Sequence, residues 1–485
     1  MSGARRELRF LLNGEEVALD DAGAGDSLLD FLRLRRGLCG TKEGCAEGDC
    51  GACTVLVGRL RDGQVRYEAV NSCIRLLPSL DCCHVVTVEH LAGADGGLHP
   101  VQQAMVDCDG SQCGFCTPGI VMVLYALWLE QPSPSDAEAR RALQGNLCRC
   151  TGYAPILKAA LIAGEYGLPE DDGLVRERGA TGARLAAMTD GRRVALAGGD
   201  VIVPADADDL ADALASEPAA TMVAGSTDVG VWVNKELRDI APAVFIGHLD
   251  ELGRIAANDR TVEIGATVSY SDAEAALTEA VPGLAEYWSR IGGWQIRNMG
   301  TVGGNIANGS PIADLPPVLI ALGAELVLRK GRTRRTMPLE AYFLDYGRQD
   351  LAPGEFVETV RVPRPPAEAQ LGFYKVSKRR DEDISSVCAG FMVRIREGRI
   401  AEARLAFGGM AATPKRARAG EAALCGRDWN KEAVKAAGEA LGKDFTPISD
   451  WRASAEYRAL VARNLLTRFY LDCTSGGSEA PEISP

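Results

Sequence analysis

One stretch decides how this chain is interpreted: GTKEGCAEGDCGACTV, residues 40–55. It places Cys45, Cys50 and Cys53 in a single glycine-rich loop, and Cys73 follows twenty residues after the third of them. A loop that brings three thiols so close together must turn tightly. Its glycines supply the permissive backbone that such a turn requires. The spacing therefore predicts a tight four-thiolate site near the N-terminus.

The spacing of this first set of cysteines, C-x4-C-x2-C…C, is that of plant-type [2Fe–2S] clusters. Four thiolates complete the tetrahedra of two irons, and backbone N–H groups of the loop can point at the sulfurs. Zinc is the alternative. Its ligands usually come as two separated C-x2-C pairs, whereas here three lie in one loop. The first set therefore favours iron–sulfur over zinc.

A second set of cysteines lies in SQCGFCTPG (111–119) and NLCRCTGY (146–153). Its C-x2-C pair alone is ambiguous between zinc, a redox thiol and iron–sulfur, but a C-x-C partner is unusual for a zinc finger. Pro118 and the apolar run after it predict a helix that begins just after the pair, with its positive dipole end near an anionic cluster. The spacing favours iron–sulfur, and zinc stays open. The second set comprises Cys113, Cys116, Cys148 and Cys150.

Composition narrows the class of protein. The 485 residues carry a formal net charge of −13, which argues against a nucleic-acid binder or a cationic membrane-surface protein. The longest apolar stretch, Ile120 to Leu129, is too short to cross a bilayer, and the N-terminus lacks the apolar core of a signal peptide. Twelve of the fifteen cysteines lie between Cys39 and Cys150. We therefore expect a cytoplasmic protein whose clustered cysteines bind metal and do not form disulfides.

Hydrophobic patterning divides the chain. Near the N-terminus, Leu8 to Leu12 runs into Asn13-Gly14, which predicts a hairpin in a β-rich domain. Four short helical patterns then predict a small bundle, and a polar, glycine-rich stretch predicts a linker before strands and helices alternate. The predicted divisions are a β-rich domain (1–90), a helical domain (91–166), a linker (167–195), an α+β domain (196–368), a second α+β part (369–473) and a disordered tail (474–485).

Three further motifs extend a resemblance that begins at the cysteines: AGSTDVG (224–230), TVGGNIANGSPIADLPP (301–317) and KRRDEDIS (378–385). With all of them in this order, the chain resembles the molybdenum hydroxylase family over nearly its whole length, and within it the iron–sulfur/FAD subunits of the bacterial xanthine dehydrogenase type. The resemblance implies a multidomain α+β fold. Its parts would be an N-terminal β-grasp ferredoxin-like domain, a four-helix-bundle [2Fe–2S] domain, an FAD-binding domain of the CO-dehydrogenase flavoprotein or vanillyl-alcohol-oxidase type, and a C-terminal α+β subdomain.

The resemblance assigns a [2Fe–2S] cluster to each cysteine set and FAD to the third domain. No G-x-G-x-x-G pattern occurs in the chain, so it has no Rossmann fingerprint for FAD or NAD. Two glycine-rich turns could bind the cofactor instead, although a glycine-rich turn by itself more often has no binding role. The residues implied to bind FAD are Thr221, Met222, Val223, Ala224, Gly225, Ser226, Thr227, Asp228, Val229, Ile291, Gly300, Thr301, Gly304, Asn305, Asp314, Val357 and Lys375.

Four implied residues also have simpler interpretations. Gln112, with Cys150, is implied to contact a molybdopterin held by a partner, but it could be an ordinary loop amide. Asp314 could cap a helix, and Lys375 could be a solvated charge on a strand. Tyr346 lies in the segment that the resemblance puts beside the flavin and the nicotinamide, but it could be a surface aromatic.

The resemblance also implies a function. The family's molybdenum centre needs several hundred residues beyond the flavin part, and this chain stops at Pro485. We therefore expect a molybdopterin-binding large subunit as partner, a dimer of heterodimers, and no hydroxylating residue on this chain. Electrons from the oxidation of hypoxanthine and xanthine to urate would pass through two clusters to FAD and then to NAD. An aldehyde or N-heterocycle hydroxylase is the alternative, and a zinc-binding interaction protein is a more distant one.

Overall fold

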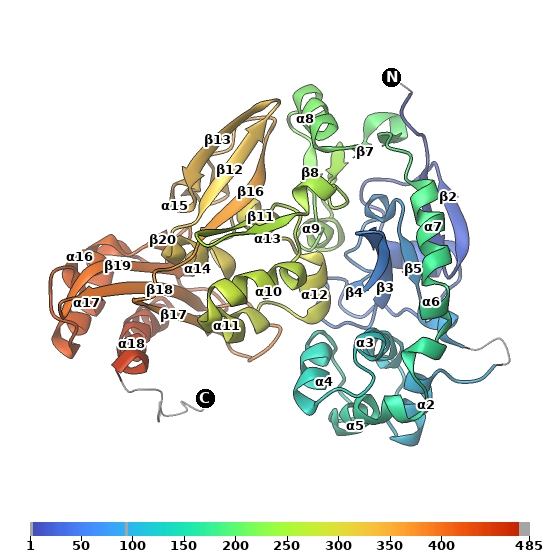
Figure 1. Cartoon of the computed structure of the whole chain (residues 1–485), viewed down its shortest axis with the longest axis horizontal. Coiled ribbons are helices and arrows are strands. Elements are labelled where there is room, and N and C mark those ends of the chain that lie inside the picture. The colour runs from blue at the N-terminus through green and yellow to red at the C-terminus, as the bar shows by residue number, and fades with distance from the viewer. Residues whose placement is uncertain (1–2, 93–95, 475–485) are drawn as a thin grey trace. The chain divides into compact units, whose positions relative to one another are not determined.

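The computed structural model describes residues 3–92 and 96–474, and the chain divides into two units. Both units combine sheets and helices, which confirms the predicted multidomain α+β class (Figure 1). The predicted third domain, 196–368, is itself divided between them. Unit 1 comprises Met1–Glu251, Ser269–Ser271 and Gly292–Thr301, and unit 2 comprises Leu252–Val268, Asp272–Ile291 and Val302–Pro485.

The N-terminal part of unit 1 is a five-stranded sheet of order β2-β1-β5-β3-β4. Strands β1 and β5 are parallel, and the other neighbours are antiparallel. Asn13 and Gly14 both have positive φ, 51° and 89°, as the predicted tight hairpin requires. The strands, with one short helix, form the β-grasp arrangement that the resemblance implies. Their bounds are β1 Leu8–Leu12, β2 Glu15–Leu19, α1 Leu28–Asp30, β3 Thr54–Arg61, β4 Gln64–Asn71 and β5 His84–Val86.

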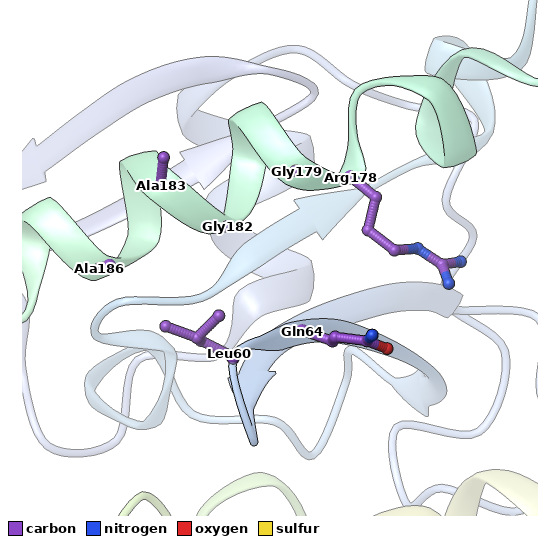
Figure 2. A pocket seen from close by; sticks show the side chains of 8 residues that line it. Leu60, Gln64, Arg178, Gly179, Gly182, Ala183 and Ala186 are labelled. Atoms are coloured by element: carbon purple, nitrogen blue, oxygen red, sulfur yellow. The ribbon is translucent and has the colours of Figure 1, made fainter.

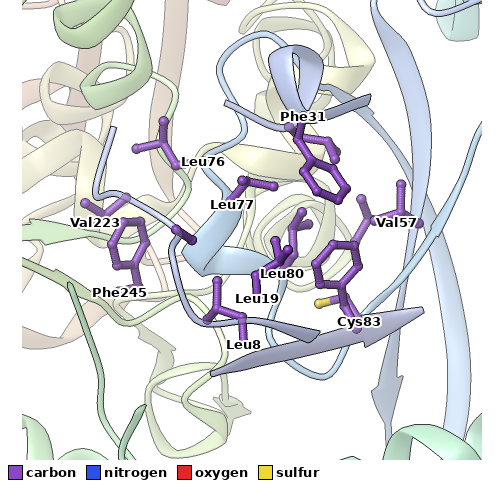
Figure 3. Packing of buried hydrophobic residues seen from close by; sticks show 14 of the residues in the cluster. Leu8, Leu19, Phe31, Val57, Leu76, Leu77, Leu80, Cys83, Val223 and Phe245 are labelled. Carbon is purple, nitrogen blue, oxygen red and sulfur yellow. The ribbon is translucent and has the colours of Figure 1, made fainter. Parts of the chain in front are cut away.

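A second, smaller sheet of unit 1 has the order β6-β7-β9-β8 and shares one hydrophobic core with the first. Figure 3 shows members of this core, among them Phe31 and Val57 from the β-grasp part and Val223 and Phe245 from the smaller sheet. One continuous core makes the two sheets a single rigid support. The elements are β6 Val194–Leu196, β7 Val201–Val203, α8 Ala207–Ser216, β8 Thr221–Val223, α9 Val229–Glu236, β9 Ala243–Phe245 and, from later in the chain, α12 Trp294–Met299.

Four helices follow the first sheet, as the sequence predicts. The longest, α3, is apolar on nearly every side, and its residues from Gly119 to Trp128 are buried because strands β3 and β4 and the neighbouring helices pack against it. Ser135 caps α4 in a capping box with Glu138. The bounds are α2 Pro100–Asp107, α3 Thr117–Glu130, α4 Asp136–Ala142 and α5 Ala154–Ile162.

The segment predicted as a linker, 167–195, is different in the structure. It contains helices α6 (Gly173–Arg176) and α7 (Arg178–Met188). Leu185 and Met188 of α7 pack against Leu11 and Val65 of the β-grasp sheet. The linker prediction fails here because a few well-spaced apolar residues are enough to attach an otherwise polar, glycine-rich helix.

Unit 2 contains a five-stranded sheet and a four-stranded sheet. One has the order β10-β11-β16-β12-β13, and the other, β17-β18-β19-β20, is entirely antiparallel. Helices α16, α17 and α18 belong to the same C-terminal core as the second sheet. The strands are β10 Ile255–Ala257, β11 Thr261–Gly265, β12 Glu325–Lys330, β13 Thr333–Pro338, β16 Glu355–Pro363, β17 Ala369–Val376, β18 Val387–Arg396, β19 Arg399–Gly408 and β20 Lys415–Arg416. The main helices are α13 Val302–Asn308, α14 Leu315–Leu322, α16 Arg418–Leu424, α17 Lys431–Asp444 and α18 Ala455–Thr474.

Among the helices of residues 3–92 and 96–474, none combines the length and the apolar composition that a membrane crossing needs. The tail predicted as disordered, 474–485, lies outside the described residues except for Thr474, which ends α18.

Candidate functional site

The first cysteine set is gathered in the β-grasp part of unit 1. The sulfurs of Cys53 and Cys73 lie 3.3 Å apart, and both residues are only 2% exposed. The Cys45 sulfur accepts hydrogen bonds from the backbone N–H groups of Asp49 and Cys50, at 3.3 and 3.4 Å. Hydrogen bonds from the Cys50 and Cys73 thiols hold the pKa of Cys45 well below its usual range. A thiolate is the form in which cysteine binds metal.

Glycines make the first loop a cradle that no larger residue fits. Gly51 has a φ of +66°, and a Cβ there would lie 2.1 Å from the carbonyl oxygen of Gly145. A Cβ at Gly44 would lie 2.7 Å from the Cys50 sulfur. The backbone therefore closes on the sulfurs as it must around a compact cluster.

Two side-chain amides, which sequence reasoning missed, hold this loop in place. Asn71 donates to the carbonyl of Gly48 at 2.6 Å. Asn234, on α9, donates to the carbonyls of Ala46 and Cys73 at 3.1 and 2.8 Å. The loop is thus fixed from both sides by buried or half-buried hydrogen bonds.

The second set lies at the start of α3 and in the loop before α5. Helix α3 begins at Thr117 with Cys116 at its N-cap, which confirms the predicted helix start. Cys150 is a close neighbour of Cys113, and Cys148 of Cys116. Burial and the neighbouring Cys148 raise the pKa of Cys116 to about 12. Cys113 and Cys150 are exposed, so the second set opens to the surface of the chain.

No three or more His, Cys, Asp or Glu side chains of the described residues form a group arranged to hold a metal ion. The sulfurs of each set instead lie close to one another: Cys73 is near both Cys53 and Cys45, and Cys113 is near Cys150. A [2Fe–2S] cluster takes two thiolates for each iron, whereas zinc takes four ligands around one ion. The closely placed sulfurs and the glycine cradle therefore fit a binuclear cluster.

The part of the predicted flavin site that belongs to unit 1 consists of two adjoining turns. Thr221–Val223 is strand β8, and residues 224–228 connect it to α9. A Cβ at Gly225 would lie 1.8 Å from the carbonyl oxygen of Met299, so this turn is packed against the start of the turn at Gly300 and Thr301. The hydroxyl of Ser226 donates to the Ile74 carbonyl at 2.8 Å and is therefore committed to the protein. The turns can offer backbone N–H groups to a phosphate.

The remaining predicted flavin residues belong to unit 2. Lys375 Nζ lies 2.5 Å from Asp314 Oδ2, and the Lys375 side chain is 1% exposed. The Ser385 hydroxyl donates to the other Asp314 oxygen. Asp314 makes no side-chain cap bond to α14. The simpler interpretations, a helix cap and a solvated strand charge, are therefore wrong. Sequence reasoning missed Ser385 as a partner although it ends the quoted KRRDEDIS motif.

Other unit 2 positions are also suited to a ligand. The Asn305 Oδ1 atom, on α13, is buried and has no hydrogen-bond partner among the described residues. A buried acceptor without a donor is costly unless a ligand supplies one. Ile291 and Val357 are buried apolar residues, and Gly304 lies on the same helix as Asn305. The unpaired Asn305 oxygen is thus a position where a ligand could supply a donor.

Three family models match the chain in the order of its domains. A [2Fe–2S] binding domain matches residues 87–161, the FAD binding domain in molybdopterin dehydrogenase matches 195–365, and the CO dehydrogenase flavoprotein C-terminal domain matches 372–473. A solved carbon monoxide dehydrogenase from Hydrogenophaga pseudoflava is 30% identical with a TM-score of 0.53, and the match covers 56% of this chain and 94% of that one. The chain belongs to the molybdenum hydroxylase family.

Members of the molybdenum hydroxylase family with different names are almost equally similar to this chain. Xanthine dehydrogenase of Emericella nidulans is 32% identical over 96% of this chain, and nicotinate hydroxylase of the same organism is 31% identical over 96%. The chain spans 39% and 40% of the lengths of these two relatives. Membership of the molybdenum hydroxylases therefore leaves the substrate open.

Two implied residues lie at the surface. Tyr346 is 74% exposed, and Gln112 is exposed beside the second set. Neither makes a contact that distinguishes its implied role from an ordinary surface residue. A cavity of about 530 Å³, between the β3–β4 hairpin and α7, holds none of the predicted site residues (Figure 2). It is lined by Leu60, Gly63, Gln64, Arg178, Gly179, Gly182, Ala183 and Ala186.

Proposed function

We propose that this chain holds two [2Fe–2S] clusters and FAD and is the electron-transfer subunit of a molybdenum hydroxylase of the xanthine dehydrogenase type. Hypoxanthine and xanthine would be oxidised to urate on a separate molybdopterin-binding subunit, and NAD would be the final acceptor. The observation that carries the proposal is the gathering of eight cysteines into two sets, in a chain whose later part matches flavin-binding models.

When bound, the clusters supply one-electron carriers and FAD a carrier that exchanges one or two electrons. The chain's own residues fix where these carriers lie. Gly51, Asn71 and Asn234 hold the first loop rigid, and rigid positioning keeps the distance between carriers constant. The buried Lys375–Asp314 pair would hold the polar edge of the flavin.

The surroundings of the second set support a docking face for the molybdopterin subunit. Phe115 and Leu147, which flank the cysteines in sequence, are 47% and 55% exposed. Exposed apolar side chains that surround a functional group are typical of a surface that a partner protein covers on binding. Gln112 and Cys150 would then contact the partner's molybdopterin. We further propose a dimer of heterodimers and a cytoplasmic location, where thiols stay reduced.

The first test is an anaerobic visible spectrum of the purified chain, with iron, sulfide and flavin analysis and a titration with NADH. The expected result is broad iron–sulfur absorption with flavin bands, both bleached by NADH. Bands that NADH leaves unchanged would overturn NAD as the acceptor. A folded chain that contains zinc and no iron or flavin would overturn the electron-transfer function itself.

An N-heterocycle or aldehyde hydroxylase of the same architecture is the second candidate, favoured by the similarity to a nicotinate hydroxylase. The complex with its molybdopterin subunit distinguishes the two candidates. Turnover of xanthine supports the first, and turnover of nicotinate or an aldehyde without xanthine supports the second.

A further inference from the structure

A side chain from the flavin-binding segment is buried between the two cysteine loops. Gln295, on α12, lies within the residues matched by the FAD-binding model, yet it belongs to unit 1 and is 0% exposed. Its Nε2 donates to Asn146 Oδ1 at 2.8 Å and to Thr54 Oγ1 at 3.1 Å. Asn146 comes two residues before Cys148, and Thr54 directly follows Cys53. Gln295 therefore joins the loops of both sets.

Both partners of Gln295 bind the same carbonyl group. Asn146 Nδ2 donates to the oxygen of Gly51 at 3.2 Å, and the Thr54 hydroxyl donates to it at 2.6 Å. The Gln295 amide thus donates to both partners, and each partner donates in turn to the Gly51 carbonyl. Gly51 directly follows Cys50. The network thus ends on the peptide next to a ligand of the first set.

A single backbone hydrogen bond connects the two sets beside this network. The N–H of Leu147 donates to the carbonyl of Cys50 at 3.0 Å. Leu147 directly precedes Cys148. Backbone atoms and one hydrogen bond are therefore all that separates a cysteine of the first set from a cysteine of the second.

The packing around this bond is close. A Cβ at Gly145 would lie 1.9 Å from Gln295 Oε1, and a Cβ at Gly119 would lie 2.2 Å from the Gly51 oxygen. The Gln295 Oε1 atom is buried and has no hydrogen-bond partner among the described residues. The two hydrogen bonds from Nε2 offset the cost of that unpaired oxygen, so the amide acts here through its hold on Asn146 and Thr54.

We propose that Gln295 is a positioning residue for electron transfer between the two clusters. By holding Asn146 and Thr54 on the Gly51 carbonyl, it keeps the Cys50–Leu147 hydrogen bond formed. The transfer moves one electron between the sets and makes or breaks no bond. The inference deepens the proposed function and rests on it, because it requires a cluster at each set.

The test compares Gln295→Met with Asn298→Ala in the full chain. Methionine keeps the length of glutamine and removes both donors. Asn298 is the control because it lies on the same helix and is also buried, but it donates to Ala69 on β4. We expect hydrogen exchange at the Leu147 amide to be about tenfold faster in Gln295→Met, from loss of at least one net hydrogen bond, and unchanged in Asn298→Ala.

The second readout is electron exchange between the clusters, measured on the chain with both clusters bound. Gln295→Met should retain its iron but lose the magnetic interaction between the two reduced clusters in electron paramagnetic resonance, or slow electron exchange between them by about tenfold. Thr54→Val should act in the same direction, and Thr54→Ser, which keeps the hydroxyl, should restore the behaviour of the unaltered chain.

Unchanged amide exchange and unchanged cluster interaction in Gln295→Met would overturn the inference. If Gln295→Met does not fold, Thr54→Val decides in the same way, and an unchanged result overturns the inference. Failure of the proposed function has a different signature: the unaltered chain would then show no iron–sulfur signals at all, which also removes this inference.

Discussion

The two cysteine sets use the same ligands in opposite surroundings. In the first set, Cys53 and Cys73 are buried in the core that supports two sheets. In the second set, Cys113 and Cys150 are exposed. Side-chain amides from distant parts of the chain bind the first loop, and the second combines local contacts, such as Cys148 with Thr151, with the distant contact of Asn146 to Gln295. The first set thus has two cysteines in the core, whereas the second set has two at the surface.

The largest expected difference between the sets follows from removing one ligand of each. Cys53→Ser should lose iron at the first set and lower the free energy of unfolding by about 4–5 kcal/mol, the size expected for a lost buried metal site. Cys113→Ser should lose iron at the second set with a smaller effect on stability. Iron analysis and denaturant unfolding measure both. Equal destabilisation by the two variants would contradict the comparison.

A matched pair of glycines tests the comparison between the two cysteine loops more closely. Gly51 and Gly114 both have positive φ, +66° and +80°, one in each cysteine loop. A Cβ at Gly51 meets the Gly145 carbonyl, whereas a Cβ at Gly114 meets nothing within 4 Å. We expect Gly51→Ala to cost about 3 kcal/mol, from backbone strain and overpacking, and Gly114→Ala to cost about 1 kcal/mol, from strain alone. Thermal unfolding would show whether the enclosed loop is the less tolerant one.

Because Cys113 and Cys150 are exposed, we expect substitutions beside them to affect binding of the proposed molybdopterin subunit. Leu147→Asp or Phe115→Asp should weaken binding of the molybdopterin subunit by about tenfold or more, because a charge replaces an apolar contact at the interface centre. Leu237→Asp is the control, since Leu237 is 84% exposed and lies outside both cysteine loops. Affinity can be measured by titration calorimetry. Unchanged affinity in both variants would place the interface elsewhere.

A further difference is one of acid sensitivity, spread over several pH units, and it begins at His84 in the β-grasp sheet. Burial lowers the pKa of His84 to about 4, and its Nε2 accepts from the N–H of Gly14. The unfolded chain binds a proton near pH 6.5, before the folded chain does. The free energy of unfolding should therefore fall by roughly 1 kcal/mol per pH unit as pH drops from 6.5 towards 4. His84→Asn should flatten this slope.

The helical domain should lose stability at a lower pH than the β-grasp sheet. Burial raises the pKa of Asp172, but hydrogen bonds from His99 and Tyr125 outweigh it and leave the pKa below its ordinary value of 3.8. The stabilisation is present above that value and is lost as pH falls through the folded pKa. Hydrogen exchange in β5 and in α3, followed against pH, tests whether the sheet weakens first. Simultaneous weakening would contradict the expected order.

Local patterns predicted local structure well. The Asn13-Gly14 hairpin and the helix that follows Cys116 both lie where turn and capping chemistry put them. The first cysteine spacing predicted that its thiols lie close together, and three of its four cysteines do belong to one loop. The linker prediction failed at α7, where Leu185 and Met188 provide the attachment inside a polar background.

Contacts between distant residues could not be predicted. Asn234 and Cys73 are 161 residues apart in sequence, and Gln295 and Asn146 are 149 apart. A lone amide has no periodic pattern, and its role depends on where the fold carries it. The Lys375–Asp314–Ser385 group was visible only as separate motif residues for the same reason.

Helix α12 has a consequence for dividing this protein. It belongs to unit 1, although the residues on both sides of Gly292–Thr301 belong to unit 2. A truncation after Glu251 would remove Gln295 and leave a hole lined by unpaired polar groups between the cysteine loops. In a version encoded as two polypeptides, the same helix would have to be supplied in trans.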